Sequence, residues 1–160
     1  MVNLFCFIAM ENKSLVILGS NRKNSLTERI TRQALQQIGY DLIDLLDHKI
    51  AHYSYDGNYP PDDEFETIIS KILPYDNLIF ATPVYWYSMS GVMKVFFDRL
   101  TDLITIRKEE GKQLRGKTAS MIAVGVDRAI PDGFETPFKH TSAYLGINYK
   151  GCTYYPVPST

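Results

Sequence analysis

The strongest constraint on the fold lies in one stretch, NLIFATPVYWYSMSGVMKVFFDRLTDL, at residues 77–103. Its residues 78–81 form a short apolar run, typical of a strand that is buried on both faces of a parallel sheet. Residues 82–90 follow as an aromatic loop, and residues 91–103 as a long, mostly apolar helix. In an open α/β sheet, ligands bind where a helix begins at the carboxyl end of a buried strand. An aromatic loop at that point predicts a flat ligand.

Four further strands are predicted around this stretch, at residues 14–18, 40–45, 118–124 and 148–154. The segment after residue 18 is expected to turn into a helix that Gly39 ends. The buried stripe of this helix recurs every four residues and comprises Leu26, Ile30, Ala34 and Ile38. Strands that alternate with helices in this way indicate a doubly wound parallel sheet. The length of the chain, 160 residues, fits one domain.

Two more helices are predicted from their capping residues. Asp63 is expected to cap the first, with Asp62 and Glu64 interacting with its dipole. One face of that helix carries Phe65, Ile68, Ile69, Ile72 and Leu73, and Pro74 ends it. Thr136 is expected to cap the second helix, with Pro137 at its first position.

Two long polar connections and one helix end complete the predicted element order. Gly146 is expected to close the helix that begins near Thr136. Residues 46–62 are predicted to form a long surface loop, of a kind that often acts as a lid or contacts a ligand. Residues 104–117 are expected to be a solvated connection.

Composition and residue pattern remove several classes of function. A formal net charge of −1 provides no bulk attraction to nucleic acid or to an anionic membrane. The cysteines, Cys6 and Cys152, form no CxxC or Cys/His cluster, and His48, His52 and His140 are scattered along the chain. No metal site is therefore predicted. This use of cysteine favours a reducing cytoplasm.

The two ends of the chain carry further expectations. Residues 4–10 form an apolar run that is too short to span a bilayer and lacks the flanks of a signal peptide. Residues 1–13 are therefore expected to be an extension, with an extra edge strand as the alternative. Only PVPST follows Tyr155, so the helix that usually follows the last strand of such a sheet is expected to be missing. The extension or a partner chain would then cover that face, unless the chain is a fragment.

The first candidate site is the turn GSNRKNSLT at residues 19–27. Backbone amides at a helix start, joined by hydroxyl groups and a guanidinium, form a site for a phosphate dianion. The turn lacks the GxxxxGK[ST] of a P-loop and the GxGxxG of a dinucleotide fingerprint, which disfavours NTP hydrolysis and a Rossmann cofactor. The alternative is that Ser25 only caps the helix, while Arg22 and Lys23 are solvated.

The second candidate site is the aromatic loop, TPVYWYSMS, at residues 82–90. Pro83 restricts the backbone where the strand ends, and Tyr85, Trp86 and Tyr87 offer broad faces for stacking. The alternatives are that these side chains form a partner interface or plug the core. Their place beyond a strand end favours contact with a ligand.

The helix at residues 91–103 carries more apolar residues than one contact with a sheet requires. One stripe comprises Val92, Phe96, Leu100 and Leu103, and Met93, Phe97 and Ile104 widen it. Core packing is the default role of such residues. Their excess predicts a homodimer that forms through this helix region.

With these stretches assembled, the chain resembles the NAD(P)H-dependent FMN reductase family of flavodoxin-like oxidoreductases. The matching pieces are GSNRKNSLT, FATPVYWYSMSGVMKVFFDRLTDL and GFETPFKHTSAYLGINYKGC. The middle piece is the most specific of the three. The resemblance implies a flavodoxin-like, FMN-binding domain at residues 14–160, with five parallel strands in the order 2-1-3-4-5.

The resemblance also implies that FMN is bound and that NAD(P)H is the co-substrate. The first loop would hold the FMN phosphate, the second would lie along the isoalloxazine ring and ribityl chain, and the third would flank the other edge of the ring. The implied residues are Ser20, Arg22, Asn24, Ser25, Leu26 and Thr27 in the first loop, Pro83, Val84, Tyr85, Trp86, Tyr87 and Ser88 in the second, and Gly125, Val126 and Asp127 in the third. The third loop departs from the more glycine-rich form that is common in the family.

The implied reaction is hydride transfer from the nicotinamide cofactor to FMN, followed by reduction of a small acceptor such as a quinone or a free flavin. The flavin carries this chemistry, so no catalytic side chain is nominated. Two other functions stay open. One is a flavodoxin-type electron carrier, which the near-neutral charge disfavours. The other is a non-enzymatic interaction protein that kept the fold, as the missing helix and the wide apolar stripe suggest.

Overall fold

The computed structural model describes residues 13–158 and shows one five-stranded sheet in the order β2-β1-β3-β4-β5. The strands are β1 (Ser14–Leu18), β2 (Tyr40–Asp44), β3 (Asn77–Pro83), β4 (Thr118–Gly125) and β5 (Asn148–Pro156). All four pairings of neighbouring strands are parallel. The predicted flavodoxin-like order is therefore confirmed. The predicted extension, residues 1–13, lies outside the described residues apart from Lys13.

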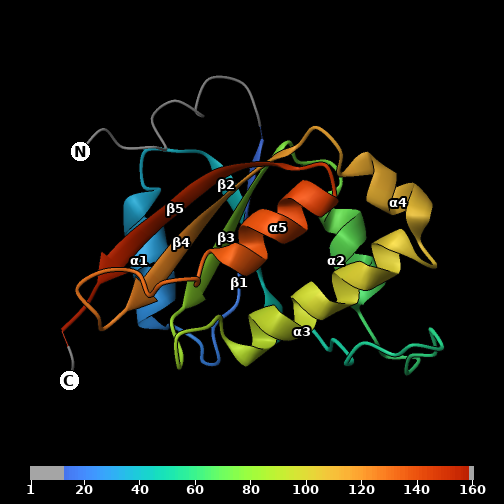
Figure 1. Ribbon diagram of the computed structural model, residues 1–160, viewed down its shortest axis with the longest axis horizontal. Coiled ribbons are helices and arrows are strands. Elements are labelled where there is room, and N and C mark those ends of the chain that lie inside the picture. The colour runs from blue at the N-terminus through green and yellow to red at the C-terminus, as the bar shows by residue number, and fades with distance from the viewer. Residues whose placement is uncertain (1–12, 159–160) are drawn as a thin grey trace.

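Helices cover both faces of the sheet, as the prediction of a doubly wound fold requires (Figure 1). The helices are α1 (Leu26–Ala34), α2 (Phe65–Ile72), α3 (Gly91–Arg99), α4 (Lys108–Gln113) and α5 (Thr136–Tyr144), with short 3₁₀ turns η2 (Leu45–Asp47) and η3 (Leu100–Ile104). Buried residues of α2, α3 and α5 pack on one face, and α1 packs on the other.

The sheet separates two hydrophobic cores, because successive side chains of each buried strand point to opposite faces. In the larger core, Phe97 of α3 lies between Phe80 of β3 and Phe138 of α5, with ring centroids 5.2 Å and 4.8 Å away. The smaller core lies under α1. It is formed by Val16, Leu18, Leu35, Ile79, Ala81, Ile122 and Val124, and the predicted α1 stripe packs against it.

Several predicted boundaries are wrong by a few residues. Helix α1 ends at Ala34, and Leu35 is its C-cap, so the helix stops well before Gly39. Strand β3 continues through Thr82 and Pro83, which pair with β4, so the second loop begins at Val84. The predicted helix at residues 91–103 is α3 followed by η3, because the last part winds as a 3₁₀ helix.

The predicted caps of two helices are also wrong. The N-cap of α2 is Glu64, which makes no side-chain capping bond. The carboxylate of the predicted cap, Asp63, bonds Arg99 and the Ala51 amide instead. The N-cap of α5 is Glu135, so Thr136 is already the first helical residue. Gly146 does follow the end of α5, with a φ of 74° that a side chain rarely tolerates.

The predicted solvated connection at residues 104–117 contains a helix, α4, that the sequence patterns did not reveal. Gly111 sits so close to η3 that an added Cβ would lie 2.0 Å from the Leu103 carbonyl oxygen. Arg107, at the N-cap of α4, forms ion pairs with Glu66 and Glu110. Tertiary contacts therefore hold a short, charged helix that lacks an apolar periodicity of its own.

Most of the apolar excess on α3 and η3 belongs to the larger core. Met93, Phe96, Phe97, Leu100 and Leu103 are all buried there. Ile104 is 38% exposed. The stripe that predicted a dimer is thus largely used within the chain.

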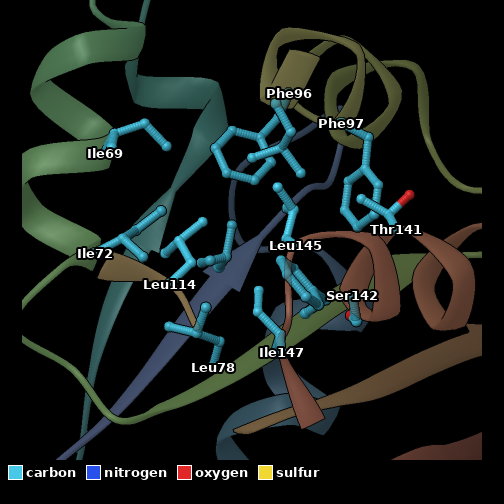
Figure 2. Close-up of a pocket in the computed structure, with 13 residues that line it drawn as sticks. Ile69, Ile72, Leu78, Phe96, Phe97, Leu114, Thr141, Ser142, Leu145 and Ile147 are labelled. Atoms are coloured by element: carbon cyan, nitrogen blue, oxygen red, sulfur yellow. The ribbon is translucent and has the colours of Figure 1, made fainter. Parts of the chain in front are cut away.

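A small cavity remains inside the larger core, where Figure 2 shows side chains of α2, α3 and α5 facing one another. Its volume is about 20 Å³, and its lining is almost entirely apolar, with Ile72, Phe96 and Leu145 among its walls. Such a space has room for about one water molecule, and an apolar lining offers a water few partners. It is too small for a cofactor, so the candidate site lies elsewhere.

Candidate functional site

Three loops meet at the carboxyl edge of the sheet, at the lower end in Figure 1. The pairing register places Leu18 beside Ala81 and Ala81 beside Ile122, so β1, β3 and β4 end at nearly the same level. Strand β1 pairs with β2 on one side and with β3 on the other. This reversal of strand order is where open α/β sheets bind ligands.

The first loop is built on the backbone of Gly19. Its amide donates to the Ala81 carbonyl oxygen at 2.8 Å, and its carbonyl oxygen accepts from the Ser90 hydroxyl at 2.7 Å. An added Cβ would lie 2.8 Å from the Cβ of Met93. Only glycine therefore allows the loop to pass this close to the first turn of α3.

Hydroxyl groups follow Gly19 at the start of α1. Ser20 is 1% exposed, and its Oγ has no hydrogen-bond partner among the described residues. Ser25 is the N-cap of α1 and accepts from the Glu28 amide at 3.1 Å, as the alternative interpretation of this turn expects, and Thr27 is buried. A buried hydroxyl without a partner is unfavourable unless a ligand satisfies it. The Ser20 hydroxyl can donate to an anionic oxygen placed at the α1 N-terminus.

The two cations of the first loop lie in different environments. Lys23 Nζ is 2.7 Å from Asp44 Oδ2 and 2.5 Å from Asp47 Oδ1, and the hydrogen bond to Asp44 raises the pKa of Lys23. Arg22 is exposed and forms no ion pair within residues 13–158. Arg22 is therefore available to an anion, whereas Lys23 is held at the end of β2. Asn24 has a φ of 51°, a conformation that asparagine tolerates.

The second loop contains a tight hairpin, called here the aromatic turn (residues 85–88). The Tyr85 amide donates to the Ser88 carbonyl at 2.9 Å, and the Ser88 amide returns a bond of 3.0 Å. Between them Trp86 and Tyr87 have φ values of 47° and 64°, the two positive values of a type I′ turn. Aromatic residues rarely adopt this conformation, and such strain gathers at ligand sites.

The side chains of the aromatic turn point to solvent rather than into the core. Trp86 is 93% exposed, Tyr87 67% and Tyr85 42%. The interpretation that these residues plug the core is therefore wrong. At the base of the loop, the Val84 amide donates to the Val124 carbonyl at 2.7 Å, which fixes the loop to β4.

The third loop follows Gly125, the last residue of β4, and is held by β5. The Tyr154 hydroxyl donates to the Asp127 carbonyl oxygen at 2.8 Å, and an added Cβ on Gly125 would lie 2.8 Å from that hydroxyl. Burial raises the pKa of Tyr154, so this donor stays protonated. Val126 lies between Gly125 and Asp127 in the sequence. It is 63% exposed and presents an apolar side chain at the carboxyl edge of the sheet.

Most of the predicted site residues are therefore brought to one edge of the sheet, but the side chains of two of them belong to the core or to a strand rather than to a loop. Leu26 packs against the smaller core, and Pro83 is buried as the last residue of β3. Within the part of the chain that the structure describes, no group of His, Cys, Asp and Glu residues could hold a metal ion. None of the described helices has the length and apolarity needed to cross a membrane.

The patterns in the sequence did not reveal a buried charge cluster around Arg99. Its guanidinium pairs with Asp63 at 2.8 Å and with Asp102 at 3.0 Å, and it donates to the Ala51 carbonyl at 3.1 Å. It also lies 3.4 Å from the centroid of the Tyr59 ring. These contacts fasten the long loop after η2 to α3. The one sequence signal that could have revealed this cluster was the position of Arg99, a charged residue beside the apolar stripe of a helix and three residues after Phe96.

The long loop also borders a cleft of about 460 Å³ beside the first loop. Its walls are formed by Asn21 of the first loop, by segment 45–52 and by the first turns of α3. His48 and His52 both line it, and His48 Nδ1 lies 3.1 Å from Glu64 Oε1. The prediction that the long loop contacts a ligand remains a prediction.

These features fit the FMN that the sequence implies. A buried, unpartnered hydroxyl, a helix N-terminus and an exposed guanidinium suit a phosphate group. A turn of three exposed aromatic residues on the neighbouring strand suits a flat ring.

Comparison with known proteins agrees with this interpretation. The sequence model of the family described as NADPH-dependent FMN reductase matches residues 12–155. A Bacillus subtilis strain 168 protein, YwqN, named as an NAD(P)H-dependent FMN-containing oxidoreductase, is 32% identical over 87% of this chain and 82% of its own. A Staphylococcus haemolyticus FMN-dependent NADPH-azoreductase is 29% identical over 55% of this chain and 52% of its own.

The fold has close counterparts among solved structures. The Trp repressor binding protein from Bacillus subtilis superimposes with a TM-score of 0.72 and 30% identity, over 90% of this chain and 84% of that one. The family match covers the first loop, the aromatic turn, the third loop and most of β5. The chain therefore belongs to the NADPH-dependent FMN reductase family and is an NAD(P)H-dependent flavin oxidoreductase with FMN as its cofactor.

Proposed function

We propose that the chain passes electrons from NAD(P)H, through FMN held at the carboxyl edge of the sheet, to a small planar acceptor such as a quinone or a free flavin. One observation carries this proposal. The Ser20 hydroxyl, which has no hydrogen-bond partner among residues 13–158, follows β1, and the exposed aromatic turn follows the adjacent strand β3. Donors for a phosphate and faces for a ring are thus available to one ligand.

At the phosphate end, the first loop would bind through the α1 N-terminus, the Ser20 hydroxyl and the Arg22 guanidinium. The proposed residues are Ser20, Arg22, Asn24, Ser25, Leu26 and Thr27. Leu26 would contribute through its backbone, because its side chain packs against the smaller core. Lys23 is left out because its ammonium group is already paired with two carboxylates.

At the ring end, the aromatic turn and the third loop would form the two sides of the pocket. The proposed residues are Pro83, Val84, Tyr85, Trp86, Tyr87, Ser88, Gly125, Val126 and Asp127. When bound, FMN supplies the two-electron redox chemistry, so these residues orient the ring and exclude water rather than transfer protons. Broad exposed aromatic faces favour a flat acceptor, and the azoreductase relative is named for reducing one such class, azo compounds.

We also infer that residues 14–160 form one FMN-binding domain that acts in the cytoplasm as a homodimer. The buried stripe of α3 is used by the core, so the contact would involve apolar residues of α3 that are only half-buried. Val92 and Val95 of α3, with Leu46 and Ile50 of the neighbouring segment, line an apolar part of the cleft there. Apolar surface of this kind favours association with a second copy.

An absorbance spectrum of the purified protein tests the proposed function. We expect a yellow protein whose flavin bands bleach when NADPH or NADH is added without oxygen and return when a quinone is added. Riboflavin in place of FMN should bind more weakly, since it lacks the phosphate. A colourless protein that also fails to bind added FMN would overturn the proposal, and bleaching without quinone-dependent recovery would overturn the choice of acceptor.

A further inference from the structure

Ser90 joins three parts of the site without facing the pocket. It is fully buried, at 0% exposure, where the second loop ends and α3 begins. Its amide donates to Thr82 Oγ1 at 3.1 Å, and its Oγ accepts from the Met93 amide at 3.2 Å. The same hydroxyl donates to the Gly19 carbonyl oxygen at 2.7 Å. One side chain thus connects β3, the first turn of α3 and the first loop.

The bond to Gly19 fixes a peptide plane that matters for the phosphate end. The carbonyl of Gly19 and the amide of Ser20 belong to the same peptide unit, which is trans, so the two groups point in opposite directions. Since the carbonyl is directed to Ser90, the Ser20 N–H is directed away from α3. The Gly19 amide, which belongs to the preceding peptide unit, is held by Ala81, so the bond from Ser90 fixes the next plane relative to an anchored one.

The close approach of the first loop to α3 makes Ser90 the polar anchor of the contact. An added Cβ on Gly19 would lie 2.8 Å from the Cβ and 2.9 Å from the Cε of Met93. The remaining contact there is therefore apolar and has no direction of its own. A directed hydrogen bond is what can set the angle of the peptide plane.

We infer that Ser90 is a positioning residue for the phosphate end of FMN. By holding the Gly19 carbonyl, it aims the Ser20 amide and the unpartnered Ser20 hydroxyl at the phosphate, while Ser90 itself does not touch FMN. The inference rests on the proposed placement of the phosphate in the first loop. FMN must fit the first and second loops together, so its affinity should depend on Ser90. The affinity for riboflavin, which lacks the phosphate, should not.

The test compares Ser90→Ala with Ser90→Gly. Both variants remove the hydroxyl, but glycine is nearly as good an N-cap as serine, so only the alanine variant loses much helix capping. FMN and riboflavin are titrated separately into the apoproteins, and quenching of flavin fluorescence reports the two Kd values. In both variants the Kd for FMN should rise about tenfold, as expected for misdirected bonds to a charged group, and the Kd for riboflavin should stay within twofold.

A second readout does not depend on flavin. In amide NMR spectra of the apoproteins, the Ser20 resonance should move in both variants. Equal losses of FMN and riboflavin affinity in the folded glycine variant, which leave the ratio of the two Kd values unchanged, would refute the role of Ser90. A wild-type protein that shows no preference for FMN over riboflavin would instead refute the proposed phosphate site.

Discussion

Adjacent residues of the same charge, Arg22 and Lys23, illustrate how single side chains in the first loop differ in role. Lys23 is bonded to Asp44 and Asp47, so its charge is neutralised within the protein. Arg22 is exposed and forms no ion pair among residues 13–158. An arginine also presents a planar fork of donors that suits phosphate oxygens. Of the two residues, Arg22 is the better partner for FMN.

Replacement of Arg22 should therefore act on the phosphate alone. Arg22→Ala is expected to weaken FMN binding by about 2 kcal/mol, the size of a lost hydrogen bond to a charged group. Riboflavin binding should hardly change. Fluorescence titrations of both ligands measure this difference.

The matched control is Lys23→Ala, which removes a cation from the same loop. Its effect on FMN should be clearly smaller, because the ammonium group is already paired with two carboxylates. Equal losses of FMN and riboflavin affinity in Arg22→Ala would show that the guanidinium does not contact the phosphate.

Among the elements, the aromatic turn is the one that departs most from local preference. Type I′ turns favour Asn-Gly, because both central residues have a positive φ. Here Trp86 and Tyr87 occupy these positions at φ values of 47° and 64°. Two bulky residues in this region cost roughly 1–3 kcal/mol each. Retention of such a turn at the ligand edge fits a role in binding rather than in folding.

A double substitution separates the two roles. Trp86→Asn with Tyr87→Gly should raise the free energy of unfolding by about 1 kcal/mol or more, since strain is relieved and almost no buried surface is lost. The same change should weaken FMN and riboflavin together, because the ring loses its stacking partners. Urea unfolding of the apoprotein and flavin titration provide the two values. A less stable variant with unchanged flavin affinity would contradict both expectations.

The Arg99 cluster holds the long loop after η2 against α3. The carboxylates of Asp63 and Asp102 flank the guanidinium, and all three residues are nearly inaccessible to solvent. Burial alone would raise the pKa of Asp63, but hydrogen bonds from Arg99 and from the Ala51 amide outweigh it and lower the pKa. Removal of one charge would leave the others buried without a partner, which is the costly case.

Arg99→Ala should therefore lower the free energy of unfolding by about 3–5 kcal/mol. Lys94→Ala, which breaks the exposed pair with Asp98, is the control on the same helix and should cost no more than about 0.5 kcal/mol. Urea unfolding at neutral pH measures both. Similar values for the two variants would show that the buried cluster contributes no more than a surface pair.

The sign of the pH dependence follows from the lowered pKa of Asp63. Stabilisation by its carboxylate is fully present above the unfolded pKa of about 3.9 and is lost as the pH falls through the lower, folded pKa. The stability difference between the wild type and Asp63→Asn should therefore be constant above about pH 5 and shrink below about pH 4.

For the whole molecule, the open question is association. Val92 and Val95 of α3 are half-buried and line a cleft of about 460 Å³. If this surface joins two copies, the wild type should sediment at about twice its chain mass of 18.3 kDa. Val95→Lys, at a position outside both cores, should shift it to the monomer without loss of fold. A wild type that is monomeric at micromolar concentration would contradict the proposed dimer.

The order of elements and the general location of the site could be predicted from the sequence because local chemistry determines them. Short apolar runs such as residues 14–18 mark buried strands, and the glycine that follows marks where a loop can begin. The phosphate-type loop and the aromatic loop are continuous in the chain, so their residues could be named before the structure. Their family resemblance then made FMN the expected ligand.

What required the structure are the contacts between residues far apart in the chain. The bond from Ser90 to Gly19, the pairing of Arg99 with Asp63, and the α4 contact at Gly111 leave no periodic trace, because each depends on where two segments meet. The different environments of Arg22 and Lys23 have the same origin, because Lys23 is paired only through its proximity to Asp44 at the end of β2. Local sequence thus specifies which segments carry the chemistry, and packing between them specifies which side chains remain free to perform it.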